Sequence, residues 1–333
     1  MSTELSVIIV NWKSKTYLRK CLESLDQHTR GIEFEVIVAD NASFDGCGEM
    51  LAAEFPKVRF IQCEKNLGFS GANNLAAKSA AGRALLFLNP DTVLLRPALE
   101  ILYKSQILLA ACGAVGARLL NTDLTLQNSC VQSFPTALNQ LLDSEATRRL
   151  FPRSSLWGMA ALYETDGAPR EVEGISGACL MIRAAVFHEV GGFDVRYFMY
   201  AEDFDLCFKI HQAGYKIYYV PQAELVHHGG GSSKRARNAF SSVQMRKAVC
   251  QFLGFRRGRL SADLFRAGLL VSSVVRLMCI GAVALLKGQR LDVSNPVINK
   301  WFAILRWSIG LDGWSRAAEL RRKSTQVGST TPF

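Results

Sequence analysis

Residues 84–95 read ALLFLNPDTVLL, an apolar run that stops at Asn89-Pro90-Asp91 and then resumes. The run is long enough to cross a protein core, and a carboxylate buried at its end is costly unless something compensates its charge. Asp91 therefore either marks the point where a buried strand reaches water or serves a ligand that needs an acid. The rest of the sequence helps to decide between these two roles of Asp91.

Short apolar runs recur along the first hundred residues at 5–10, 35–39, 58–61 and 84–88. Continuous apolar runs of this length are typical of strands buried on both faces. Helical patterns separate them, one with Leu18, Cys21, Leu22 and Leu25 on one face, and others over 46–55, over 71–81 and from Pro97 onward. The alternation predicts an α/β fold with a parallel sheet covered by helices on both faces.

An asparagine or aspartate follows each of these strands, namely Asn11, Asp40 with Asn41, Asn66, and Asn89 with Asp91. Each is also an ordinary turn or cap residue, but four on one edge favour a binding edge, because ligands of such sheets bind at the carboxyl ends of the strands. Neither a GxGxxG fingerprint nor a Walker motif is present, and Gly68 and Gly71 are only a weak phosphate-loop signal.

The second half of the chain carries two clusters of reactive side chains. YAEDFDLCFKIHQAGY (200–215) places Glu202, Asp203 and Asp205 at the start of a helix that Gly214 ends. The helix dipole and capping also favour acids there, but a paired acid is what general-base chemistry uses. ELVHHGGGSSK (224–234) places His227 and His228 between a strand and a glycine-rich turn, where they favour a ligand or phosphate contact.

The remaining segments of this half connect the clusters. Residues 121–174 lack a clear period and predict loops and short helices above the binding edge, and 175–194 predict a strand, a short helix and a Gly191-Gly192 turn.

The composition points to a globular protein with an anionic partner. Hydrophobic residues make up 49% of the chain, and 39 basic residues against 29 acidic ones give a formal charge of +10. The nine cysteines are scattered singly, which predicts buried, reduced thiols and a reducing compartment. The N-terminus lacks the pattern of a signal peptide, so we expect a cytoplasmic protein.

The C-terminal region changes character beyond Ser233. A basic stretch (234–259) precedes AGLLVSSVVRLMCIGAVALL (267–286), which has about the length of a membrane span. Arg276 at its centre costs on the order of 3 kcal/mol on insertion scales. Trp301, Phe302, Trp307 and Trp314 follow Pro296 among basic residues, a pattern of helices lying at an anionic membrane surface.

Two alternatives for this region stay open, a packed helical subdomain or oligomer contact, and a true span. The tail from Arg321 is expected to be disordered. No aromatic platform or DNA-binding motif supports a nucleic-acid partner.

Seven segments together resemble the family 2 glycosyltransferases, in particular their bacterial rhamnosyltransferase-like branch. They occur in the family's order over about residues 4–235 and read SVIIVNWKSKTYLRKCLESL, VADNASFDG, KNLGFSGANN, FLNPDT, SGACLMIRAAVFHEVGGFD, FMYAEDFDLCFKIHQAGY and VHHGGGSS. The resemblance implies a GT-A fold, a nucleotide-binding sheet flanked by helices.

The resemblance also assigns roles to individual residues. Asp203 would be the catalytic base, with Glu202 beside it, and Asp91 and His227 would bind Mg²⁺ or Mn²⁺. The residues implied to border the acceptor are Ser176, Gly177 and Ala178. The residues implied to bind the nucleotide-sugar are Val10, Asn11, Asp40, Asn41, Ser43, Asn66, Gly68, Phe69, Asn73, Asn89 and Asp91.

The implied activity is inverting, metal-dependent transfer of L-rhamnose from dTDP-L-rhamnose to a lipid-linked saccharide in cell-surface polysaccharide biosynthesis. A UDP-sugar donor (galactofuranose, a hexose or an N-acetylhexosamine), a sugar-nucleotide-forming nucleotidyltransferase and a non-catalytic nucleotide-binding membrane adaptor are the alternatives. Two departures from the family pattern stand out: the metal motif keeps one acid, Asp91, and Gly174 occupies a position that is often aromatic.

The implied domains are a glycosyltransferase domain over 1–235, a basic and apolar helical extension over 236–320 and a tail over 321–333. The first divides into a nucleotide-sugar-binding half (1–120) and an acceptor and catalytic half (121–235). The protein would lie on the inner face of the cytoplasmic membrane.

Overall fold

The computed structural model describes residues 3–163, 166–229, 239–288 and 295–311. The chain divides into two compact units, Met1–Arg235 and Ala236–Phe333. The first contains the sheet and every residue that the sequence assigns to catalysis or donor binding. The second is helical.

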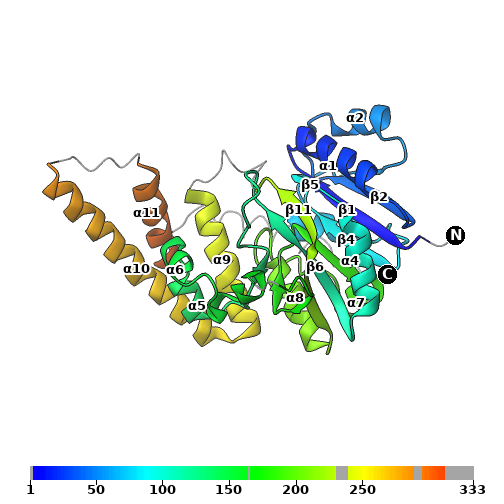
Figure 1. The fold of residues 1–333 in the computed structure, drawn as a ribbon. Coiled ribbons are helices and arrows are strands. Elements are labelled where there is room, and N and C mark those ends of the chain that lie inside the picture. The colour runs from blue at the N-terminus through cyan, green and yellow to red at the C-terminus, as the bar shows by residue number, and fades with distance from the viewer. Residues whose placement is uncertain (1–2, 164–165, 230–238, 289–294, 312–333) are drawn as a thin grey trace, which may run out of the picture. The chain divides into compact units, whose positions relative to one another are not determined.

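The first unit is built on one large mixed sheet (Figure 1), with the strand order β3-β2-β1-β4-β10-β6-β11-β5 and β8 paired with β11. Its strands are β1 (Leu5–Asn11), β2 (Phe34–Asp40), β3 (Arg59–Gln62), β4 (Ala84–Leu88), β5 (Thr92–Leu94), β6 (Cys112–Leu120), β8 (Arg170–Glu171), β10 (Cys179–Arg183) and β11 (Lys216–His227). β7 (Val131–Gln132) and β9 (Gly174–Ile175) form a separate small sheet.

The expected parallel sheet is confirmed for the first half of the chain but not for the whole. β1 pairs in parallel with β2 and β4, and β2 pairs in parallel with β3. β10, however, inserts between β4 and β6 and is antiparallel to both. The chain reaches β10 along the same edge at which β4 ends, since the backbone N–H of Asn89 donates to the carbonyl of Ala178. The strand must therefore run back across the sheet.

Helices cover the sheet of this unit: α1 (Lys15–His28), α2 (Cys47–Glu54), α3 (Gly68–Ala77), α4 (Ala98–Leu108), α7 (Ala184–Glu189) and α8 (Glu202–Gln212). The face of α1 predicted from Leu18, Cys21, Leu22 and Leu25 is buried as expected. α3 begins three residues before the predicted start at Gly71, because the side chain of Asn66 accepts the N–H of Gly68 and begins the turn there.

The segment between β6 and β10 contains the predicted loops and short helices. These are α5 (Ala137–Leu142), α6 (Glu145–Leu150), η1 (Ser155–Trp157) and η2 (Met159–Tyr163). Capping boxes at Thr136 and Ser144 begin α5 and α6. All nine cysteines of the chain are free, and seven are buried, in agreement with the sequence prediction.

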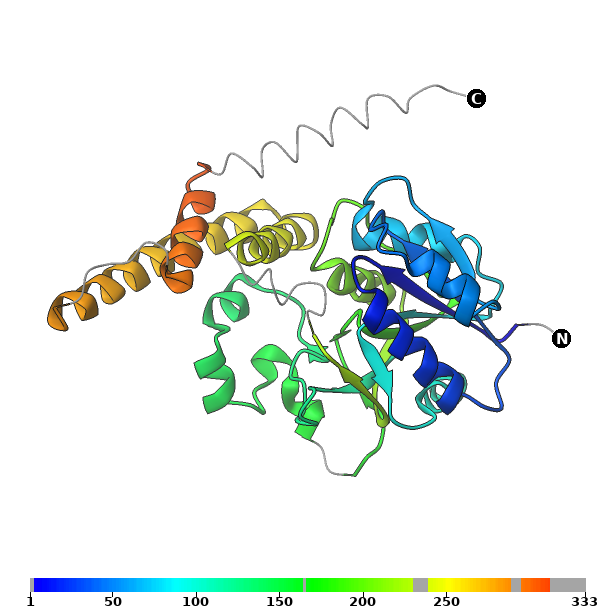
Figure 2. The same ribbon diagram turned by 90° about the horizontal axis from the view of Figure 1, so that it is seen from above.

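The second unit consists of α9 (Ala239–Arg256), α10 (Arg259–Leu286) and α11 (Pro296–Ser308), and Figure 2 shows α10 as the longest of them. The helices pack on one another through Phe252, Phe265, Ile304 and Trp307. Within the described residues, α10 is the one helix with the length and composition to cross a membrane, and 11% of its apolar window is buried. The glycine-rich turn after Gly229, the first part of the basic stretch and the tail lie outside the described residues.

Candidate functional site

The ends of β1 and β2 meet in a buried polar cluster. Nδ2 of the fully buried Asn11 lies 2.8 Å from Oδ1 of Asp40 and 3.1 Å from Oγ of Ser43. The Asp40 carboxylate also accepts the backbone N–H groups of Ser43 and Phe44 and the amide of Gln62. Burial alone would raise the pKa of Asp40, but the hydrogen bonds from Ser43, Gln62, Asn11 and Phe44 outweigh it, and the pKa lies below its usual value. Asp40 is therefore a fixed anion that orders this edge.

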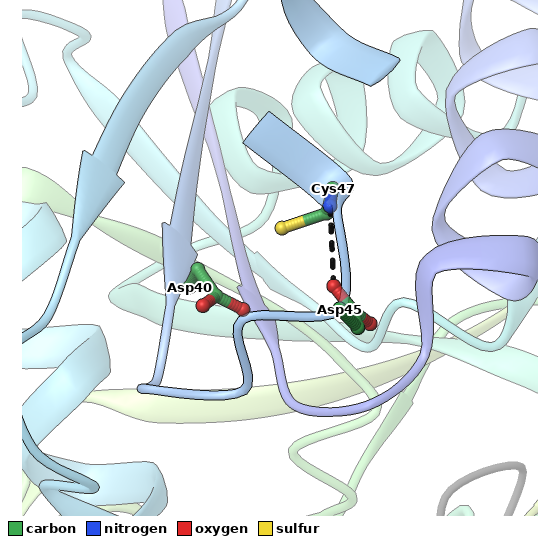
Figure 3. Close-up of side chains that lie close together, drawn as sticks. All are labelled: Asp40, Asp45 and Cys47. Atoms are coloured by element: carbon green, nitrogen blue, oxygen red, sulfur yellow. Dashed lines mark hydrogen bonds between the residues drawn. The ribbon is translucent and has the colours of Figure 1, made fainter. Parts of the chain in front are cut away.

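Asp40, Asp45 and Cys47 form a group of potential metal ligands (Figure 3), with their ligand atoms within 4.8 Å of one another. The backbone N–H of Cys47 donates to Asp45 at 3.2 Å. Burial raises the pKa of the Cys47 thiol far above its usual value, and the charges of Asp40 and Asp45 add to this. A thiol must lose its proton to bind a metal, and Asp40 already accepts several hydrogen bonds. The group therefore fits the ordering of the β2–α2 loop better than metal binding.

A pocket of about 420 Å³ opens beside Asp40. Its walls include the aromatic rings of Phe44 and Phe60 and the side chain of Gln62. Phe44 is 70% exposed. The pocket thus offers aromatic surface and a polar rim next to a fixed carboxylate, which is the combination found in small-molecule sites.

The loop between β3 and α3 is joined to the end of β2. The side chain of Asn41 donates to Asn66 and to the carbonyl of Gly68, and it accepts the N–H of Leu67. The amide of the buried Asn73 donates to the carbonyl of Phe69. The predicted residues Asn41 and Asn66 thus join the end of β2 to α3, which contains Gly68, Phe69 and Asn73. Val10 lies half-buried at the end of β1.

Asp203, at the start of α8, lies at the same edge. Its Oδ2 accepts the backbone N–H of Gly177 at 3.1 Å, and its Oδ1 accepts the N–H of Phe204 at 2.9 Å. A side chain at Gly177 would meet Cβ of Asp203 at 3.5 Å and the ring of Phe69 at 3.6 Å. Gly177 thus lies between the predicted base and the predicted nucleotide loop. Ser176 makes the turn here, since its Oγ accepts the N–H of Ala178.

Glu202 and Asp203 have different environments although they are adjacent. Glu202 is buried, and its Oε2 has no hydrogen-bond partner among the described residues. Burial raises the pKa of Glu202 well above its usual value, and the charge of Asp203 raises it further. Burial also raises the pKa of Asp203, but N–H groups of Gly177 and Phe204 oppose the shift. N–H groups of two other residues stabilise the anion of Asp203, whereas Glu202 has, among the described residues, only its own backbone N–H, so the pKa of Glu202 is raised the more strongly.

The backbone before these acids is strained. Tyr200 and Ala201 have φ angles of 68° and 62°, in the left-handed region that non-glycine residues rarely occupy. Each such residue costs on the order of 1 kcal/mol or more and persists where the surrounding structure enforces it. This turn fixes the direction from which Glu202 and Asp203 enter α8.

Asp91 and His227 are brought together by the pairing of β5 with β11, in which Thr92 lies opposite His227. Oδ1 of Asp91 is 3.3 Å from Nε2 of His227, and Nδ2 of Asn89 is 3.2 Å from the same nitrogen. On the other side of the ring, Nδ1 is 2.7 Å from Oε1 of Gln127. Since Nδ1 can only donate to this oxygen, Nε2 is left to face Asp91.

The chemistry of this pair fits a divalent cation. An imidazole nitrogen and a carboxylate oxygen are suitable ligands for Mn²⁺, and carboxylate also suits Mg²⁺. Two ligands at right angles about 2.1 Å from an ion lie about 3 Å apart, close to the observed Asp91–His227 separation. Gln127 supplies the contact behind the ring that orients histidine ligands in metal sites.

Three polar residues of this edge were not predicted from the sequence. Gln62 ends β3 and follows the same strand-end rule that identified Asp40. Asp45 holds the β2–α2 loop. Gln127 lies 100 residues from His227 in a segment without periodicity, and no sequence signal marks it.

The fold is shared with solved sugar-transferring enzymes. Similar solved folds include GalNAc-T7 with UDP, GalNAc and Mn2+ (TM-score 0.54, 18% identity, 68% of this chain and 44% of that chain). Another is the mannosyltransferase PcManGT from Pyrobaculum calidifontis with GDP-Man and Mn2+ (TM-score 0.55, 15% identity, covering 95% of this chain and 88% of that chain). The architecture is of the GT-A type.

The chain belongs to glycosyl transferase family 2, whose model matches residues 6–191. A second model, glycosyl transferase family group 2, matches residues 147–305. The chain is 31% identical to N-acetylglucosaminyl-diphospho-decaprenol L-rhamnosyltransferase of Mycobacterium tuberculosis over 71% of its length and 79% of the relative's. It is 26% identical to rhamnosyltransferase WbbL of Escherichia coli over 67% of its own length and 82% of the relative's. The sequence-based family assignment is confirmed, and the protein is a glycosyltransferase.

Proposed function

We propose that this glycosyltransferase moves L-rhamnose from dTDP-L-rhamnose to a lipid-linked saccharide, with inversion at the anomeric carbon, in cell-surface polysaccharide biosynthesis. The observation that carries the proposal is the half-buried Asp203 carboxylate, held by the N–H of Gly177 beside Phe69. The rhamnosyl assignment is supported by the two rhamnosyltransferases among the relatives. A UDP-sugar donor is the alternative, since thymine and uracil offer the same ring edge to Asp40.

In this proposal Asp203 is the general base. The acceptor hydroxyl gives its proton to the Asp203 carboxylate while its oxygen attacks the anomeric carbon on the face opposite the leaving group. The bond from that carbon to the diphosphate oxygen breaks, and the nucleoside diphosphate leaves with the electron pair. A single displacement inverts the anomeric carbon and needs no enzyme nucleophile. The raised pKa of Asp203 makes it a stronger base than an ordinary carboxylate.

The donor would lie along the edge formed by Asn11, Asp40, Asn41 and the loop at Gly68, with its base in the pocket lined by Phe44 and Phe60. Asp91 and His227 would hold Mg²⁺ or Mn²⁺, which neutralises the charge of the diphosphate. Ser176, Gly177 and Ala178 would border the acceptor. Gly174, buried in β9, is closely packed in this region, since an added Cβ would lie 3.3 Å from the carbonyl oxygen of Gln132 and 3.7 Å from the ring of Phe204.

We further propose that the C-terminal unit attaches the enzyme to the inner face of the cytoplasmic membrane. Large apolar side chains of α10 are exposed, including Val271, Met278 and Leu286. Asp263 is the one acidic residue among those that the structure describes in this unit, whereas basic residues occur on α9, α10 and α11. Apolar and basic surfaces together suit the anionic, partly apolar boundary of a bilayer.

The test is donor turnover. Purified protein is mixed with Mg²⁺ or Mn²⁺, a membrane lipid extract and a panel of dTDP- and UDP-sugars, and nucleoside diphosphate release is followed with and without EDTA. We expect release from dTDP-L-rhamnose that EDTA abolishes. Release from a UDP-sugar alone would overturn the rhamnosyl assignment, and release that EDTA leaves unchanged would overturn the metal assignment.

A further inference from the structure

Three basic side chains from three different helices gather on one indole ring in the C-terminal unit. Cζ of Arg276 in α10 lies 4.4 Å from the centroid of Trp301 in α11. Cζ of Arg246 in α9 lies 5.5 Å from it, and Nζ of Lys300 lies 5.3 Å from it. The ring itself is 9% exposed. The helices of this unit therefore hold the three charges in a fixed arrangement.

Cation–π contact compensates only part of the cost of this arrangement. One such contact contributes about 0.5–1 kcal/mol at an exposed site, while three like charges within a Debye length of one another repel. Among the residues that the structure describes, neither Arg276 nor Lys300 pairs with an acid, and Asp263 lies against Arg259. The pKa of Lys300 is lowered by burial and by the charges of Arg246 and Arg276. An anion bound here would relieve the repulsion.

An apolar surface is exposed on the same two helices, α10 and α11, that contribute to the cluster. Val271, Val275 and Met278 share one face of α10 at helical spacing and are 62%, 52% and 69% exposed. Val297, one turn before Trp301 on α11, is 53% exposed. Arg276 projects from another side of α10, toward Trp301 of α11, and its Nε lies 3.3 Å from Oγ of Ser272. A ligand that suits both features carries a phosphate next to hydrocarbon chains.

We propose that Arg246, Arg276 and Lys300, held on the ring of Trp301, bind the phosphate group of a membrane lipid. This inference rests on the proposed membrane attachment and not on the transfer reaction. It also gives Arg276 a role, because a guanidinium in an apolar helix is compatible with a bilayer surface when a lipid phosphate meets it. The phosphate could belong to an anionic phospholipid or to a lipid-linked diphosphate.

The test is sedimentation of the full chain with vesicles of phosphatidylcholine, with and without added phosphatidylglycerol. Arg276→Gln removes a charge of the cluster, and Lys300→Gln does the same from another helix. Arg259→Gln is the matched control, because Arg259 is in α10 as well but its side chain is 94% exposed and lies 3.7 Å from Asp263. We expect Arg276→Gln and Lys300→Gln each to weaken binding to the anionic vesicles about tenfold or more. Arg259→Gln should weaken it no more than about fivefold.

Equal losses in Arg259→Gln and Arg276→Gln would mean diffuse charge attraction and would overturn the site. Arg276→Met separates charge from apolar burial, and tighter binding by this variant would also overturn it. The site would also be overturned if the cluster substitutions changed the oligomeric state of the protein and left vesicle binding intact, because the cluster would then contact a second copy of the chain. Circular dichroism checks that the variants are folded.

The two sources of phosphate are distinguished by further vesicles. Binding to phosphatidylcholine that carries a polyprenyl diphosphate, without phosphatidylglycerol, would identify the lipid-linked diphosphate, and binding only with phosphatidylglycerol would identify the phospholipid. Donor turnover with a detergent-solubilised acceptor is measured in parallel. Cluster-dependent vesicle binding without turnover would support this site while counting against the proposed reaction.

Discussion

Nδ1 of His227 lies 2.7 Å from Oε1 of Gln127, and this contact fixes the tautomer of the histidine. The Gln127 amide cannot rotate freely, because its nitrogen donates to Asn121 at 3.2 Å and to the carbonyl of His227 at 3.3 Å. Its oxygen therefore faces the ring and accepts the proton of Nδ1. The other ring nitrogen, Nε2, then faces both Asp91 and the amide of Asn89.

We predict that Gln127→Leu weakens Mn²⁺ binding in the presence of a nucleoside diphosphate about 10- to 100-fold, because the ring of His227 loses its orientation. Gln127→Glu should retain most of the affinity, since a carboxylate can still accept the proton of Nδ1. Isothermal titration calorimetry measures both, with Asp91→Ala as the reference for loss of a direct ligand.

Gln132→Leu is the control for Gln127→Leu, because the Gln132 side chain donates to the carbonyl of Ser129 and, within the part of the chain that the structure describes, forms no hydrogen bond with His227. Its Mn²⁺ affinity should equal that of the unmodified protein. Unchanged affinity in Gln127→Leu would contradict the orienting role.

The two acids of α8 should respond differently to amide substitution. Asp203→Asn removes the proposed base and should lower turnover about 10²- to 10⁴-fold, with nucleotide binding largely intact. Glu202→Gln should cause a far smaller loss, because burial raises the pKa of Glu202 well above its usual value and glutamine has nearly the shape of the neutral acid. Steady-state kinetics and nucleotide calorimetry on both variants provide the test. A larger loss in Glu202→Gln than in Asp203→Asn would reverse the assignment of the base.

Glu202 should also make the stability of the protein depend on pH. The unfolded chain loses this proton near pH 4.3, whereas the folded protein keeps it to higher pH because burial raises the pKa of Glu202. The folded state then binds more protons, so this residue lowers the free energy of unfolding by about 1.4 kcal/mol per pH unit above the unfolded value, until the folded pKa is reached.

Glu202→Gln should therefore be more stable than the unmodified protein at neutral pH, and the difference should shrink toward pH 4. Urea unfolding at several pH values between about 4 and 8 measures it. Asp194→Asn is the contrast: the hydrogen bonds of Arg196 outweigh burial and hold the pKa of Asp194 below its usual value, so this variant should be less stable than the unmodified protein by a nearly constant amount across this range. A constant difference across this range for Glu202→Gln would exclude a buried protonated carboxyl.

Much of the first unit could be predicted because its signals are local. Each of the apolar runs at β1, β2, β3 and β4 became a strand, and the polar residues that follow them, such as Asp40, meet at one edge. The antiparallel insertion of β10 could not be predicted, because strand order depends on contacts between distant segments. The contact of Gln127 with His227 could not be predicted either, because it also joins distant segments of the chain.

Backbone strain was equally inaccessible from the sequence. The left-handed pair Tyr200 and Ala201 contains no glycine, asparagine or aspartate that would signal such a conformation. Packing enforces this turn, so the local sequence gives no indication of it. The carboxylates that follow could be recognised, but their different environments could not.

Gly68 allows a close approach between the start of α3 and the segment before α8. Its φ is +73°, and a Cβ added there would lie 2.5 Å from the carbonyl oxygen of Phe198. That oxygen accepts the N–H of Phe69 at 3.0 Å, so Gly68→Ala must disturb this hydrogen bond as well as the backbone. We predict a loss of free energy of unfolding clearly beyond the roughly 1–2 kcal/mol that a left-handed alanine costs, together with weaker nucleotide binding.

Gly191→Ala separates the two effects. Gly191 also has a positive φ, +78°, but a Cβ there would meet nothing within 4 Å. This variant should lose only the conformational part and should bind nucleotide normally. Urea unfolding and nucleotide calorimetry on both variants measure the difference, and equal losses would mean that the approach of Phe198 to Gly68 does not restrain the loop.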